Sequence, residues 1–140
     1  EGLEGVRAVV EEALYCRVKR WEIIAPKENF FSQFDEAYAR YFLETRERRS
    51  IVARSLWEKG LSRHVLNAAE LERRNPRWLP EAMKGAFRSL IILFDDKVAI
   101  ISSYDALSAI LIRSEEINAT FKAMFDALWI GAEPYRPPKK

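Results

Sequence analysis

Cysteine and histidine are nearly absent from this chain of 140 residues, which limits the chemistry open to it. Cys16 is the only cysteine, so no disulfide bond can form within the chain. His64 is the only histidine, and one His with one Cys cannot make up the ligand set of a structural zinc site. We therefore expect neither a metal centre nor a cofactor. A single cysteine also fits a reducing compartment.

Long hydrophobic runs are absent as well. No stretch approaches the ~20 apolar residues that a helix needs to cross a bilayer. The start of the chain is acidic and amphipathic, unlike a secretory signal peptide. These absences predict a cytoplasmic protein with no membrane partner. The chain also begins at Glu1 without a methionine, and we expect that an N-terminal part of the protein precedes it.

Neither sign of charge is in large excess, since the net charge is +2. The distribution is uneven: residues 40–90 hold 12 Lys and Arg against 6 Asp and Glu, so the rest of the chain carries a net charge of −4. A basic middle suits an anionic ligand or a nucleic acid. The alternative, which the sequence favours, is that these side chains form the solvated faces of amphipathic helices.

Apolar residues make up 49% of the chain, which predicts a folded domain with a sizeable core. We expect one domain over residues 1–131 and a flexible tail over 132–140. Helical spacing and short apolar runs predict the elements of the first half. In chain order these are a helix over 5–14, a strand over 21–25, a helix over 33–49, a strand over 51–57 and a short helix that opens at Asn67.

The stretch from Leu90 to Trp129 carries the most information. Two apolar runs, 90–94 and 98–101, flank the polar turn Asp95-Asp96-Lys97. Short continuous apolar runs around a turn predict a hairpin of buried strands. We expect both aspartates to be turn residues, because aspartate side chains readily bond to nearby backbone.

The end of the chain predicts a strand over 109–112 and a closing helix. Ser114 is a good N-cap, and the apolar stripe behind it predicts a core-facing helix that ends at Gly131. A chain that alternates helices and strands in this way predicts the α/β class, with a mixed β-sheet packed by helices.

The hairpin resembles the end of a phospholipase-D-type catalytic motif. That motif places a Lys two residues after a His, an Asp five residues after the Lys, and then a Gly-Ser pair. With Asp95 in the Asp place, Arg88 replaces the His, Leu90 replaces the Lys and Ser102 replaces the Gly. The strand-turn-strand pattern of the motif is present, but its nucleophile is missing. This combination resembles the effector-binding domain of TrmB-like transcriptional regulators. Those carry a catalytically inactive, phospholipase-D-like domain behind a DNA-binding winged helix.

The resemblance implies a phospholipase-D-like fold without enzymatic activity, since a guanidinium stays protonated and cannot replace the His nucleophile. It also implies a pocket where the motif strands end, built from groups that hydrogen-bond sugar hydroxyls or clamp an anion. The candidate ligand-binding residues are Arg54, Arg88, Ser102, Ser103 and Asp105. Tyr38, Tyr41 and Trp57 suit a sugar pocket by their rings, but their spacing favours core positions.

Three functions remain open at this point. The leading hypothesis is a regulatory domain that senses a small effector (a sugar or an anion), forms a homodimer, or does both, and that reaches DNA only through the preceding domain. Phospholipase-D-like folds pair two similar halves around a two-fold axis, which favours a homodimer. The alternatives are a pure homodimerisation module without a ligand and a domain that binds nucleic acid directly through its basic middle.

Overall fold

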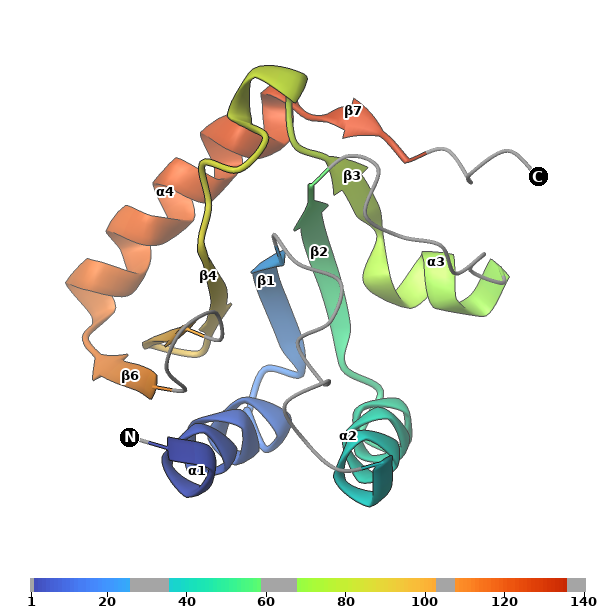
Figure 1. Cartoon of the computed structure of the whole chain (residues 1–140), viewed down its shortest axis with the longest axis vertical. Coiled ribbons are helices and arrows are strands. Elements are labelled where there is room, and N and C mark those ends of the chain that lie inside the picture. The colour runs from blue at the N-terminus through green and yellow to red at the C-terminus, as the bar shows by residue number, and fades with distance from the viewer. Residues whose placement is uncertain (1, 26–35, 59–67, 103–107, 136–140) are drawn as a thin grey trace.

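A seven-stranded mixed sheet forms the centre of the computed structural model, which describes residues 2–25, 36–58, 68–102 and 108–135 (Figure 1). The strand order is β6-β5-β4-β1-β2-β3-β7. The helices are α1 (Gly2–Leu14), α2 (Glu36–Arg48), α3 (Ala68–Arg74) and α4 (Glu115–Gly131). The strands are β1 (Arg20–Ala25), β2 (Val52–Trp57), β3 (Pro76–Trp78), β4 (Ser89–Phe94), β5 (Lys97–Ser102), β6 (Ser108–Arg113) and β7 (Glu133–Pro134). The expected α/β class with a mixed sheet is confirmed.

The sheet is mixed because its two halves are connected differently. Strands β1, β2 and β3 are parallel, since α2 and α3 carry the chain back between them. Strands β4, β5 and β6 form an antiparallel meander, and β4 pairs antiparallel with β1 to join the halves. The β4–β5 hairpin turns at Asp95, whose φ of 50° lies in the left-handed region that aspartate tolerates.

Each face of the sheet is covered by helix, with α1 and α2 on one side and α4 on the other (Figure 1). Alternation along the strands divides the apolar side chains between the two faces. The core on the α1–α2 face includes Val6, Val10, Leu14, Trp21, Phe42, Ile51, Leu90, Ile92, Phe94 and Ile101. The core on the α4 face is formed by Ile24, Leu56, Leu79, Leu93, Val98 and Phe125.

Helix α4 is anchored to the β4–β5 turn at its start. The Ser114 hydroxyl accepts a hydrogen bond from the backbone N–H of Ile117 at 3.2 Å, as expected of an N-cap. The Ser114 backbone N–H donates to the Asp96 carbonyl at 2.9 Å. One turn further on, the buried Asn118 amide donates to the Lys97 carbonyl at 2.8 Å. These bonds fix where α4 begins its path across the sheet.

Two short strands were not expected from the sequence. Trp78 lies in β3, for which no strand was expected, and the tail expected over 132–140 begins with β7, which pairs antiparallel with β3. Tyr135 then packs against the rings of Trp57 and Trp78, with centroids 5.8 and 5.0 Å away. Strands of two or three residues, each containing a proline, carry no detectable alternation. Residues 136–140 and the expected start of a helix at Asn67 lie outside the described residues.

No helix in the described part of the chain is both long enough and apolar enough to cross a membrane.

The burial of α4 gives a first test. Phe125 is 1% exposed at the centre of the α4-face core, whereas its neighbour Met124 is 51% exposed. Phe125→Ala should lower the free energy of unfolding by about 3–5 kcal/mol, because it removes a buried ring and leaves a cavity. Met124→Ala, the matched control, should change it by less than about 1 kcal/mol. Urea denaturation of both variants measures this, and equal losses would mean that α4 does not cover the sheet.

Candidate functional site beneath helix α4

The strand-turn-strand frame of the motif is present in β4 and β5, and Asp95 has a structural role in it. Its carboxylate accepts hydrogen bonds from the backbone N–H groups of Arg17 and Val18, at 2.9 and 3.0 Å. Asp95 therefore ties the α1–β1 connection to the hairpin, some 77 residues away in sequence. The expectation that it is a turn residue is confirmed, and no local sequence pattern indicates this long-range contact.

The residues at the other motif positions do not meet in one place: one is in the core, and two lie at an end of the sheet. Leu90, in the place of the motif Lys, is buried in the core on the α1–α2 face. Arg88 is exposed just before β4 begins. Its neighbour Ser89 pairs with Ser102 at the end of β5, so Arg88 and Ser102 lie at the same end of the sheet. Ser103 and Asp105 lie outside the described residues.

Arg54 does not join them. It lies in the middle of β2, and its row across the sheet continues through Glu22 and Leu93 to Val98. Ser102 is four residues further along β5 and three strands away, about 13 Å along the strands and about 14 Å across them. The expected grouping of Arg54 with the strand-end residues is therefore wrong, because the register places Arg54 beside Glu22 instead.

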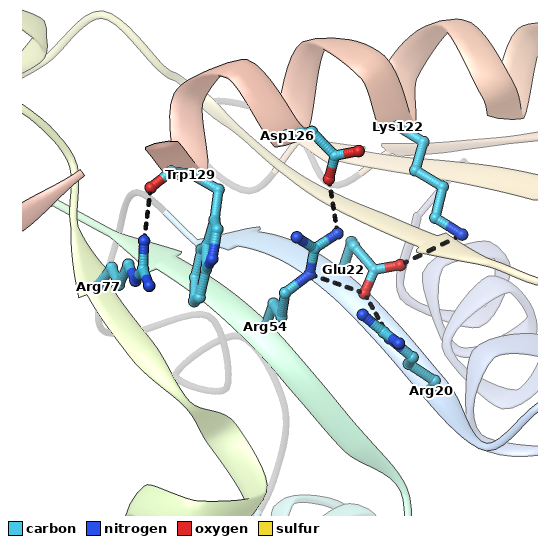
Figure 2. A network of polar contacts seen from close by, with 7 residues as sticks. All are labelled: Arg20, Glu22, Arg54, Arg77, Lys122, Asp126 and Trp129. Atoms are coloured by element: carbon cyan, nitrogen blue, oxygen red, sulfur yellow. Dashed lines mark hydrogen bonds and ion pairs between the residues drawn. The ribbon is translucent and has the colours of Figure 1, made fainter. Parts of the chain in front are cut away.

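Glu22 and Arg54 are part of a charge network between the sheet and α4 (Figure 2). Glu22 is 3% exposed. Its carboxylate lies 3.2 Å from Arg20 Nε, 3.6 Å from Arg54 Nε and 3.8 Å from Lys122 Nζ, and Arg54 Nη2 lies 2.7 Å from Asp126 Oδ1. We call these five residues the Glu22 network. It holds three positive and two negative charges, so it is positive by one.

Aromatic rings of α4 complete the surroundings of Arg54. Its guanidinium lies 5.0 Å from the centroid of Phe125 and 5.5 Å from that of Trp129. Arg77 of β3 lies 4.1 Å from the Trp129 ring on the other side and donates to the Trp129 carbonyl at 2.9 Å (Figure 2). Cations near aromatic faces are stabilised by the ring quadrupole. The two arginines thus hold the second half of α4 on β2 and β3.

Two cavities adjoin Glu22. A groove of about 370 Å³ runs between α4 and the sheet, and Glu22 is the one charged residue among those that line it. Its walls are otherwise apolar and include Ile24, Phe87, Ile91, Leu93, Phe121 and Met124. A smaller hollow of about 70 Å³ is polar, with Arg20, Glu22, Asp95, Asn118 and Lys122 in its lining. The groove suits an apolar body, and the hollow suits water or a small polar group.

The aromatic residues considered for a sugar pocket do not form one. The hydroxyls of Tyr38 and Tyr41 donate to the Glu11 carboxylate, at 3.3 and 2.9 Å, and so join α2 to α1. Burial, reinforced by Glu11, raises the pKa of Tyr38 to about 12. The hydrogen bond to Tyr15, together with burial and Glu11, raises the pKa of Tyr41 as well. Trp57 lies apart from them, against Trp78.

No family model matches this sequence, and no curated protein is significantly similar to it. Solved structures share its fold. The archaeal chromatin protein TrmBL2, described as showing a novel mode of DNA binding, superposes with a TM-score of 0.58 at 15% identity, over 94% of this chain and 52% of TrmBL2. This chain therefore spans about half the length of TrmBL2.

Two bacterial proteins match over nearly their whole lengths. Nuc from Salmonella typhimurium, a phospholipase D family member, gives a TM-score of 0.63 at 14% identity, over 96% of this chain and 94% of Nuc. NucT from Helicobacter pylori gives 0.61 at 10% identity, over 94% and 91%. The phospholipase-D-like fold expected from the hairpin is thus confirmed, and it is the fold of both a DNA-binding chromatin protein and a phospholipase D family member.

The Glu22 network gives the second test. Arg54→Met should lower the free energy of unfolding by about 2–3 kcal/mol, because Glu22 stays buried with only Arg20 and Lys122 beside it. Asp126→Asn, the control on the exposed side of Arg54, should cost less than about 1 kcal/mol. The double variant Glu22→Gln/Arg54→Met should lose less stability than its two single variants together. Additive losses in denaturant melts would show that the two residues are not coupled.

Proposed function

We propose that this chain is a non-catalytic regulatory domain of the TrmB-like type, which pairs with a second copy, senses a small effector, or does both. The observation that carries the proposal is that the residues at the motif positions have structural roles or the wrong chemistry for catalysis. Leu90 lies in the core, Asp95 is engaged by two backbone N–H groups, and Arg88 is a permanent cation. The hairpin is retained as framework, and none of these three groups is suited to attack a phosphodiester.

Phospholipase-D-type hydrolysis needs a His nucleophile and a second His as general acid. The chain has one histidine, His64, which lies outside the motif and outside the described residues. Among the described residues, no three potential metal-ligating side chains gather at one place either. These observations support a domain that acts by binding.

We expect no turnover of bis(p-nitrophenyl) phosphate by the purified chain, with a phosphodiesterase of known activity as positive control. The reason is the missing nucleophile at position 88. The measurement is release of p-nitrophenol. Turnover that persists through purification and disappears in the His64→Ala variant would contradict the non-catalytic assignment.

The groove beneath α4 is the better developed of two places for an effector. Its volume of about 370 Å³ is within the range of small-molecule sites, and it combines apolar walls with charge at one end. A ligand there would contact α4 and β4 together and so bias how α4 lies on the sheet. Such a bias is the physical form of effector sensing. The strand-end residues Arg88, Ser102, Ser103 and Asp105 are the second place proposed for a ligand.

The outer face of α4 supports pairing with a second copy. Between Ile117 and Gly131 the charged side chains, Lys122 and Asp126, turn back to the Glu22 network. The remaining exposed residues of this stretch are uncharged: Ile117, Ala119, Thr120, Ala123, Met124, Ala127 and Ile130. An exposed helix face without free charge is unusual in a monomer and typical of an interface.

We expect a homodimer in solution through this face. Ala123→Glu places a charge at its centre and should shift the mass measured by light scattering from dimer to monomer without loss of helicity. Ala8→Glu, the same change at an exposed position of α1, should leave the dimer intact. A wild-type mass equal to the monomer at the highest soluble concentration would remove the homodimer from the proposal.

Direct nucleic-acid binding is the second candidate, favoured by the basic middle and by the fold shared with TrmBL2. Several of the arginines concerned are committed inside the molecule. Arg54 pairs with Glu22 and Asp126, and Arg77 binds the Trp129 carbonyl. Arg49 donates to the carbonyls at the end of α1. Fewer cations are thus left for phosphates than the composition suggests, so we rank this candidate below the regulatory domain.

A further inference from the structure

Arg46, in the last turn of α2, lacks the polar partners that the other inward-facing arginines have. Its guanidinium lies 4.9 Å from the centroid of the Trp21 ring. Its Nη2 is shut off from solvent and has no hydrogen-bond partner. Within the described residues, Arg46 makes neither an ion pair nor a side-chain hydrogen bond. A guanidinium nitrogen that is shut off from solvent without a hydrogen-bond partner costs free energy, and here that nitrogen belongs to a cation without a counter-ion among the described residues.

Two positive charges on α3 add to this cost. Arg73 and Arg74, at the end of α3, repel the Arg46 guanidinium, and burial together with Arg74 and Arg73 lowers the pKa of Arg46 to about 9. A guanidinium stays charged at neutral pH, so this repulsion is present under ordinary conditions. Arg73 lies 3.5 Å from Glu47, and Arg74 lies 3.7 Å from Glu70. In each pair the carboxylate largely offsets the charge of its arginine. Of these three arginines, Arg46 alone has no carboxylate partner among the described residues.

The two helix ends offer one alternative explanation. Cations are favourable at helix C-termini, and this accounts for Arg73 and Arg74 in the last turn of α3. It does not account for Arg46, whose guanidinium donates to no carbonyl in the part of the chain that the structure describes. Arg49, by contrast, binds carbonyls at the end of a helix: it donates to those of Leu14 and Cys16 at 2.7 and 3.2 Å.

We propose that the ends of α2 and α3 form a binding site for a small phosphate-type oxyanion, with Arg46 at its base and Arg73 and Arg74 at its mouth. The mouth is open to solvent, because the side chains of Arg73 and Arg74 are 32% and 27% exposed. Their ion pairs are long and partly exposed, so an oxyanion can replace a carboxylate as partner. Guanidinium groups bind such oxyanions through paired N–H···O bonds.

The site is separate from the phospholipase-D motif. Helix α2 leads into the first residue of β2, whereas Arg88 precedes β4, which runs antiparallel to the β1–β2 pair. The Arg46 site and the Arg88 end therefore lie at opposite ends of the sheet, and the inference is independent of whether the motif is catalytic. With Arg73 and Arg74 paired to Glu47 and Glu70, the three arginines carry one excess charge, which fits a free phosphate or a phosphorylated metabolite rather than a run of DNA phosphates.

The test is calorimetric titration of the chain with inorganic phosphate, at constant ionic strength set with chloride. We expect saturable binding that Arg46→Met weakens by about tenfold or more. Arg40→Met, which removes an exposed arginine from the same helix, should leave the affinity unchanged. Glu47→Gln should strengthen binding, because it frees Arg73 from its carboxylate; Glu47 is 67% exposed, so the fold should tolerate the change.

Thermal melts establish that each variant is folded, and Arg74→Gln replaces Arg46→Met if the latter does not fold. Titration with ribose 5-phosphate and with a short DNA duplex distinguishes the source of the phosphate group. Arg46-dependent binding of phosphate or of the sugar phosphate supports the proposal. No saturable phosphate binding by the wild-type chain, equal loss in Arg40→Met, or Arg46-dependent binding of the duplex alone would overturn it.

Discussion

The buried carboxylate of Glu22 is the constraint on which much of this structure depends. It lies on β1, the strand where the parallel and antiparallel halves of the sheet meet, and it faces α4. A carboxylate taken out of water must be compensated by nearby cations, and here these come from β1, β2 and α4. Charge compensation therefore fixes α4 over the central strands at a defined place, which apolar packing alone specifies less strictly.

The Glu22 network also determines the two surfaces of α4 to which we assign a function, the groove beneath it and its outer face. Because α4 is held at its start by the hairpin turn and near its middle by Lys122 and Asp126, a groove remains between it and β4. Beyond the first turn of α4, its charged side chains pair with the Glu22 network, which leaves the outer face of residues 117–130 uncharged. A groove on one side of a helix and an apolar face on the other provide a direct physical link, because a ligand that shifts α4 also shifts any interface built on it.

The β4–β5 hairpin shows how motif positions can serve the fold itself. Leu90 contributes to the core and Asp95 holds the α1–β1 connection, so packing and backbone bonding account for both residues. The anion site proposed at Arg46 is formed by the ends of α2 and α3, with no contribution from Leu90 or Asp95. In that case this chain binds phosphate-type groups at the ends of α2 and α3, and not at the motif strands.

The sequence by itself determined the α/β class, the four helices and the five longer strands, because the strands and the longer helices have a clear hydrophobic pattern and residues such as Asn67 and Ser114 mark helix starts. It also indicated the phospholipase-D-like frame through the spacing of the β4–β5 hairpin. Only the tertiary structure decided that Arg54 faces Glu22, that Asp95 reaches Arg17, and that Arg46 is left without a partner. Strand register and helix placement set these contacts between residues far apart in sequence, and no local pattern encodes them.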